Sequence, residues 1–353
     1  MIAIQASAPG KVILMGEHAA LHGCPVIASS IGLYCNVWVR PHRDGLAELK
    51  LPDLEIHRFY ELGQLVDYTL RVRQAWERYR SEPTSRHFEQ VRGMDPDHLV
   101  KCAIGEILLR LPPKDWHGFS LRVRSQIPVD AGFGSSGAVA VTLVAALLRL
   151  FRLPATEDSI QSLALTLERY VHGQPSGIDH NTSLRGSVVE RRSTGEGAFR
   201  LTSSPAENLN MALHGLQIYH TGAAREGTGQ VIAATRDRLA GLGNPLLGSM
   251  CRNTERFCSL LQQTRPMPET LKAVVRDYEA DLEKLGVVPA AVAEVIRAIE
   301  RSGGAAKICG AGALSGDSAG ALLVVDAPSL PALRRYRRID ATLGVSGLEI
   351  SEQ

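Results

Sequence analysis

Residues 128–140 read PVDAGFGSSGAVA, a glycine-rich turn between two segments of regular structure. Alternating apolar and polar residues over 119–127 predict a strand before the turn, and the apolar run to Leu150 predicts a helix after it. Glycines let a backbone approach a ligand closely, and the amides at a helix start favour an anion. The turn therefore predicts a phosphate cradle, although a serine-capped helix after a tight turn explains the same residues.

Two common nucleotide-binding loops do not account for this turn. No lysine precedes Ser135 and Ser136 in the G-K-[ST] arrangement of a P-loop. The glycine spacing and the lack of a strand–helix–strand setting exclude the dinucleotide fingerprint of doubly wound sheets. A serine hydroxyl at a helix start can also bind Mg²⁺, so the turn is compatible with a metal-assisted phosphate site.

The composition narrows the class of protein. Of 353 residues, 39 are Lys or Arg and 37 are Asp or Glu, and the resulting net charge of +2 argues against a nucleic-acid-binding protein. Hydrophobic residues make up 44% and charged residues 22%, as in globular proteins, and the length suggests two domains. The longest apolar stretch, residues 138–148, is too short to cross a membrane, and the N-terminus lacks a secretory signal.

The six cysteines are scattered and form no C-x-x-C pair, so the sequence does not support a zinc ribbon. In a chain of this length they are expected to be free, buried thiols in a reducing cytosol. We therefore expect a soluble cytoplasmic protein that binds neither membranes nor nucleic acid.

The predicted elements are mostly strands in the first half and mostly helices in the second half, which closes with strands. This order favours two α+β domains with a cleft between them over a doubly wound parallel sheet. Residues 82–97 are expected to form a loop, residues 330–338 a helix, and the small polar residues 193–210 a linker.

The segment SAPGKVILMGEH, residues 7–18, places Lys11, Glu17 and His18 in apolar and glycine-rich surroundings. Taken one at a time, an exposed strand-end lysine and a satisfied turn histidine explain these residues. Their grouping is what makes them candidates for a site.

The segment ERYVHGQPSGID, residues 168–179, runs from a helix into a glycine and a proline that end it. Ser176 and Asp179 then have the spacing of a simple helix cap. Alternatively, Glu168 and Asp179 supply a metal ligand and a base, which are parts that phosphoryl transfer to an alcohol requires.

Together, these segments resemble the motifs of the GHMP kinase superfamily, and within it those of the mevalonate kinases. The first motif corresponds to APGKVILMGEHAALHG (8–23) and the second to PVDAGFGSSGAVA (128–140). Residues 168–179 resemble the segment with the family's metal-ligand Glu and catalytic Asp, and KICGAG (307–312) resembles the third motif. The motifs follow the family's order and span nearly the whole chain.

The resemblance implies an α+β, two-domain GHMP kinase fold with the active site in the cleft. Residues 1–205 would form an N-terminal, ribosomal-S5-like domain that binds the nucleotide and carries the catalytic residues. Residues 206–353 would form a C-terminal α/β-sandwich GHMP domain. The implied cofactors are ATP and Mg²⁺, the implied reaction is phosphorylation of (R)-mevalonate to 5-phosphomevalonate in isoprenoid precursor synthesis, and a homodimer is one expectation.

The resemblance also implies a role for each matching residue. Asp179 would take the proton of the acceptor hydroxyl, and Lys11 would neutralise charge at the transferred phosphoryl group. Gly132, Phe133, Gly134, Ser135 and Ser136 would surround the triphosphate, Ser136 and Glu168 would bind Mg²⁺, and Glu17, His18, Asp179, Gly310, Ala311 and Gly312 would contact the acceptor. Thr228 matches a family threonine through a short local similarity only.

Departures from the family pattern leave the identity of the acceptor substrate open. His180 stands where mevalonate kinases usually have Asn, and Phe133 and Gly137 stand where Leu and Ala are usual. The third motif continues as ALSGD over 313–317 in place of further glycines, which resembles phosphomevalonate kinases.

These departures keep two alternatives in view. One is a GHMP kinase for phosphomevalonate or another small hydroxyl compound, with Arg191, Arg192 or Arg225 as candidate cations for an acceptor phosphate. The other is a catalytically silent homologue that senses a ligand.

Overall fold

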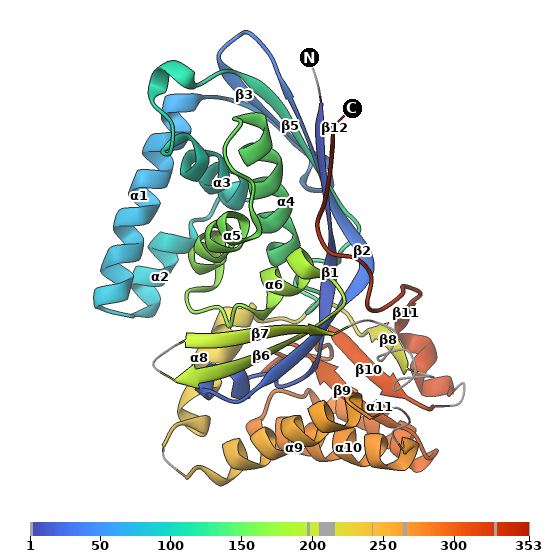
Figure 1. Ribbon diagram of the computed structural model, residues 1–353. Coiled ribbons are helices and arrows are strands. Elements are labelled where there is room, and N and C mark those ends of the chain that lie inside the picture. Colours follow the sequence, from blue (N-terminus) through green and yellow to red (C-terminus); the bar gives the residue numbers. More distant parts are fainter. Residues whose placement is uncertain are drawn as a thin grey trace.

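The computed structural model describes residues 3–195, 198–204, 216–241, 243–263, 267–327 and 330–352. These residues form helices and two β-sheets, so the predicted α+β class is confirmed (Figure 1). No helix in these ranges is long and apolar enough to cross a membrane.

The larger sheet has the strand order β12-β1-β2-β5-β3-β4, and the hairpin β6–β7 joins it at β2. Its strands are β1 (Ile4–Met15), β2 (Val26–Pro41), β3 (Leu46–Leu51), β4 (Ile56–Glu61), β5 (Phe119–Ser125), β6 (Val188–Gly195), β7 (Ala198–Ser204) and β12 (Glu349–Glu352). The pair β3–β5 is parallel, and the other pairs are antiparallel. The length of β2 follows from its β-branched and aromatic residues, which favour a pleated, half-buried surface.

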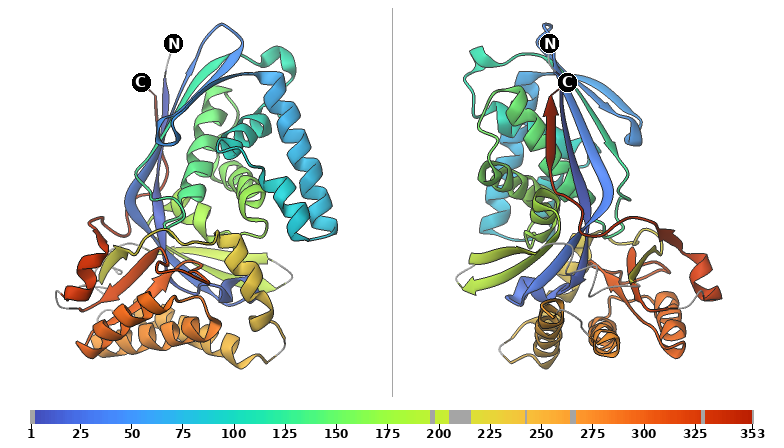
Figure 2. Two further views of the ribbon diagram at one scale, coloured as in Figure 1. Left: turned by 180° about the vertical axis from the view of Figure 1, so that it is seen from behind. Right: turned by 45° about the vertical axis from the view of Figure 1, so that its right-hand side comes forward.

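Helices α1 to α5 cover one side of this sheet (Figures 1 and 2). The helices of this half are α1 (Leu62–Ser81), α2 (Ser85–Arg92), α3 (His98–Leu108), α4 (Ser135–Leu150), α5 (Glu157–His172) and α6 (Ile178–Arg185). Helix α4 contacts β1 and β2 and also α3, α5 and α6. Because it is enclosed in this way, α4 is apolar almost all round, as expected of a buried helix.

The smaller sheet has the order β11-β8-β10-β9 and is antiparallel throughout. Its strands are β8 (Leu216–His220), β9 (Ala305–Cys309), β10 (Ala321–Val325) and β11 (Arg337–Ile339), and its part of the chain contains α8 (Thr228–Leu239), α9 (Pro245–Leu261), α10 (Pro268–Leu285) and α11 (Ala290–Arg301). Every residue of β9 is buried, Lys307 included. The chain then returns to the larger sheet, where β12 pairs with β1 (Figure 2).

Three local predictions are wrong. The predicted loop 82–97 contains α2, whose first turn is capped by the Thr84 hydroxyl accepting from the His87 amide at 3.2 Å. The predicted helix 330–338 is a 3₁₀ turn, Pro331–Arg335, followed by β11. The predicted linker begins with the β6–β7 hairpin, and its remainder lies outside the described residues, as does the predicted domain boundary at 205/206.

The expectation of six free thiols is also wrong, because Cys24 and Cys251 form a disulfide. Their Cα atoms are 5.3 Å apart and their positions differ by 227 residues. The bond ties the loop after β1 to helix α9. The other four cysteines are free and buried, as predicted.

Cys251→Ala is expected to lower the free energy of unfolding by about 2–4 kcal/mol, because the crosslink restricts the unfolded chain. A matched control is Cys258→Ala, which removes a buried free thiol from the same helix. In urea titrations, dithiothreitol should destabilise the wild type and Cys258→Ala but leave Cys251→Ala unchanged. Equal curves for the wild type with and without reductant would contradict the disulfide.

Candidate active site

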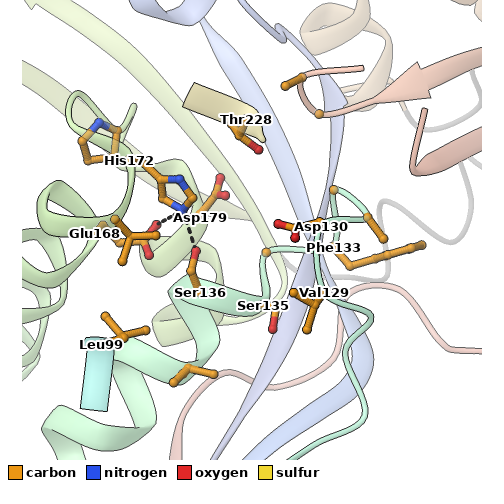
Figure 3. Close-up of a pocket in the computed structure, with 18 of the residues that line it drawn as sticks. Leu99, Val129, Asp130, Phe133, Ser135, Ser136, Glu168, His172, Asp179 and Thr228 are labelled. Atoms are coloured by element: carbon orange, nitrogen blue, oxygen red, sulfur yellow. Dashed lines mark hydrogen bonds and ion pairs between the residues drawn. The ribbon is translucent and has the colours of Figure 1, made fainter. Parts of the chain in front are cut away.

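A cavity of about 580 Å³ brings together residues from distant parts of the chain. Figure 3 shows side chains from the glycine turn, α4, α5, α6 and α8 around it. Of the residues singled out from the sequence, these line it: Lys11, Glu17, His18, Gly132, Phe133, Gly134, Ser135, Ser136, Glu168, Asp179, Thr228, Gly310 and Ala311. Gly312 does not line it and packs instead against the backbone of Val287.

Lys11 and Asp179, the two predicted catalytic residues, are in direct contact. The Lys11 Nζ lies 3.2 Å from Asp179 Oδ1, and the lysine side chain is 3% exposed whereas that of Asp179 is 30% exposed. Lys11 belongs to β1, just after a register shift, and Asp179 lies in the first turn of α6. The pair therefore presents a carboxylate to the cavity with a buried cation directly beside it.

The glycine turn approaches β1 closely. The Lys11 amide donates to the Phe133 carbonyl oxygen at 2.9 Å, and Gly134 is left-handed (φ +71°). Gly134 is also the N-cap of α4, and no side chain caps this helix. The serine-cap explanation is thus wrong, and the first amides of α4 are left to face an anion.

Glu168, from α5, is almost completely buried and borders the cavity. Its Oε1 atom has no hydrogen-bond partner among the described residues. Burial raises the pKa of this carboxyl. A buried carboxylate with an unpartnered oxygen is costly, so its surroundings favour a bound cation.

His172 is a residue of the site that the sequence reasoning missed. Its Nε2 atom lies 2.8 Å from the Ser136 Oγ and 4.0 Å from Glu168 Oε2 (Figure 3). The sequence contained a signal for this residue, because Glu168 and His172 are four residues apart on one predicted helix and so share a face. The imidazole joins the serine at the start of α4 to the carboxylate of α5.

Glu17 and His18 follow β1 and contact the second half of the chain. The carboxylate of Glu17 forms a salt bridge with Lys307 of β9, and its carbonyl oxygen accepts from the Tyr278 hydroxyl at 2.8 Å. The His18 Nε2 donates to the Ala311 carbonyl oxygen at 3.0 Å. Burial lowers the pKa of His18 to about 4, so its ring is neutral at pH 7.

A model of the family described as GHMP kinases N terminal domain matches residues 98–187. The mevalonate kinase of Thermococcus gammatolerans is 29% identical over 318 residues, which cover 88% of this chain and 86% of the relative. The mevalonate kinase of Homo sapiens is 28% identical and is matched over 98% of this chain and 92% of its own.

Solved structures show the same fold. The mevalonate kinase of Methanococcus jannaschii superposes with a TM-score of 0.71 at 18% identity, covering 100% of this chain and 97% of the other. The galactokinase of Lactococcus lactis reaches 0.70 at 16% identity, covering 98% and 95%.

The chain has the GHMP kinase fold, and its residues 98–187 match the N-terminal domain of that family. Among curated proteins it is similar to mevalonate kinases of archaea and mammals over most of its length.

Gly134→Ala is expected to disturb the Lys11–Asp179 pair, because an added Cβ would lie 2.6 Å from Lys11 Cγ. The control is Gly45→Ala, which has nearly the same φ (+70°) and nothing within 4 Å of the added carbon. Left-handed alanine costs each variant about 1–2 kcal/mol. In urea unfolding, Gly134→Ala should lose more free energy of unfolding than Gly45→Ala. Equal losses in the two variants would contradict this packing.

Proposed function

We propose that this kinase transfers the γ-phosphoryl group of ATP to the 5-hydroxyl of (R)-mevalonate and yields 5-phosphomevalonate, an isoprenoid precursor. The observation that carries the proposal is the Lys11–Asp179 pair, which borders the same cavity as Ser136 and Glu168. The similarity to mevalonate kinases of several organisms supports this choice of acceptor.

In this proposal Asp179 is the general base. The acceptor oxygen forms a bond to the γ-phosphorus, its proton passes to the Asp179 carboxylate, and the bond to the β-phosphate oxygen breaks to release ADP. Lys11 lies beside Asp179 and neutralises charge on the transferred group. The 30% exposure of the Asp179 side chain leaves this carboxylate accessible to the acceptor, whereas Glu168 is enclosed.

The glycine turn is proposed to hold the nucleotide phosphates. The uncapped amides at the start of α4, together with the backbone from Gly132 to Ser136, offer donors to the triphosphate. The predicted division into a nucleotide-binding half, 1–205, and a GHMP half, 206–353, stays a prediction. Thr228, Gly310 and Ala311 of the cavity lining come from the second of these halves.

The Glu168 carboxylate and the Ser136 hydroxyl fit a Mg²⁺ ion. They are oxygen donors, and Glu168 Oε1 is buried without a described partner. The described residues contain no group of three His, Cys, Asp or Glu side chains arranged for a metal. This agrees with Mg²⁺, which usually binds one or two carboxylates and substrate phosphates. The ion would supply charge neutralisation at the phosphates.

The charges of the cavity favour mevalonate over a phosphorylated acceptor. The Lys and Arg residues among its described lining are Lys11 and Arg92. The three arginines that were candidate phosphate ligands, Arg191, Arg192 and Arg225, do not line it. A phosphomevalonate kinase would have to neutralise several additional charges on the acceptor.

The unusual loop 313–317 lies outside the described lining. It is held by Glu226, whose carboxylate accepts from the Leu314 amide at 3.1 Å and from the Ser315 hydroxyl. The departure of the third motif therefore lies outside the part of the cavity wall formed by Gly310 and Ala311. A homodimer and a cytoplasmic location stay predictions, and the Cys24–Cys251 disulfide weighs against the reducing cytosol.

Mevalonate is expected to be the preferred acceptor in a coupled ADP-release assay with Mg-ATP. The panel should include phosphomevalonate, galactose and a reaction without acceptor, because the fold is shared with kinases of different substrates. Faster turnover of phosphomevalonate would replace the proposed acceptor. Absence of turnover with millimolar mevalonate would contradict the proposal.

Asp179→Asn is expected to lower kcat by about 10²–10⁴-fold, because a proton acceptor acts in the chemical step. The ATP affinity, measured by calorimetry, should be largely retained. Asp158→Asn is a matched control, since Asp158 occupies the same position of the first turn in α5 as Asp179 in α6. A silent ligand sensor would bind ATP, but neither its wild type nor its Asp179→Asn variant would show turnover.

A further inference from the structure

A buried lysine, Lys307 of β9, forms a salt bridge with Glu17 across 290 positions of the sequence. The side chains are 0% and 1% exposed. Taking both charges out of water costs free energy, and the attraction between them often fails to repay that cost. Stability alone is therefore a weak reason for this pair.

Other polar groups around Lys307 do not replace Glu17 as its counter-charge. The Cys309 Sγ lies 3.8 Å from the ammonium, and the Tyr278 ring centroid lies 5.8 Å away. Burial raises the pKa of Glu279 to about 8, so this carboxyl is mostly protonated at pH 7. In the described salt bridges, Glu17 is the partner of Lys307.

The two oxygens of Glu17 have different surroundings. Oε1 contacts Lys307, whereas Oε2 is buried and has no hydrogen-bond partner among the described residues. Glu17 also borders the cavity that contains Asp179. An unpartnered carboxylate oxygen in such a place is satisfied when a ligand donates a hydrogen bond.

We propose that Lys307 is a positioning residue, which fixes one oxygen of Glu17 so that the other accepts a hydroxyl of the alcohol acceptor. The inference rests on the proposed phosphorylation of a small alcohol and adds a residue outside the cavity lining to it. The inference does not require the acceptor to be mevalonate, because any alcohol acceptor has a hydroxyl that can donate to Glu17.

The test compares Lys307→Met, Glu17→Gln and the double variant by steady-state kinetics, using whichever alcohol of the acceptor panel the wild type phosphorylates. Lys307→Met should raise the acceptor KM about tenfold or more, with the ATP dissociation constant within twofold of wild type. The double variant should match Glu17→Gln, because Lys307 acts through Glu17.

If Lys307→Met fails to fold, the double variant still tests the inference. Removing both members of the pair leaves no uncompensated buried charge. Lys272→Met is the control, because Lys272 is another buried lysine with carboxylate partners and does not line the cavity. It should keep the wild-type acceptor KM. Thermal melts of all variants separate loss of fold from loss of positioning.

If folded Lys307→Met has the acceptor KM of the wild type, the inference is overturned while the proposed function still stands. A double variant whose acceptor KM is raised well beyond that of Glu17→Gln would do the same, because Lys307 would then act independently of Glu17. If the wild type transfers phosphate to no alcohol of the panel, the proposed function fails and the inference fails with it.

Discussion

At the centre of the molecule the Lys11 amide donates to the Phe133 carbonyl oxygen at 2.9 Å, which holds β1 against the glycine turn before α4. A side-chain carbon on Gly10 would lie 2.7 Å from that same oxygen, and one on Gly134 would overlap Lys11. The approach therefore requires residues without a Cβ on both segments. It leaves the lysine side chain pointing along the turn toward Asp179.

A second close approach completes the arrangement. A Cβ on Gly137 of α4 would lie 2.9 Å from the His180 amide, so glycine lets α6 pack directly on α4. This contact sets Asp179 beside Lys11, although the two are far apart in sequence. An alanine at position 137 would require α4 and α6 of this chain to lie further apart.

The segment after β1 is held mainly by the second half of the chain. Lys307 and Tyr278 bind Glu17, Ala311 binds His18, and Cys251 is bonded to Cys24. Groups from the first half, such as Asp179 and Ser136, thus face groups whose positions depend on the second half. The cavity needs both halves of the fold.

The local motifs were recognisable in the sequence because each is a short run that resembles a motif of the kinase family. Lys11, Ser136, Glu168 and Asp179 were found in this way, and all four border one cavity. Contacts between distant positions were not predictable from patterns. The Cys24–Cys251 bond spans 227 residues, and the partner of Lys307 lies 290 residues away. Helix α2 was missed because its polar residues and flanking prolines resemble a loop.

The most direct measurement is a crystal structure of the wild type with ADP, Mg²⁺ and mevalonate. We predict that the 5-hydroxyl of mevalonate lies within hydrogen-bond reach of Asp179, about 2.6–3.2 Å, with the Lys11 ammonium beside it and the diphosphate along the turn before α4. An acceptor bound elsewhere, or a 5-hydroxyl that faces away from Asp179 with the nucleotide in place, would contradict it.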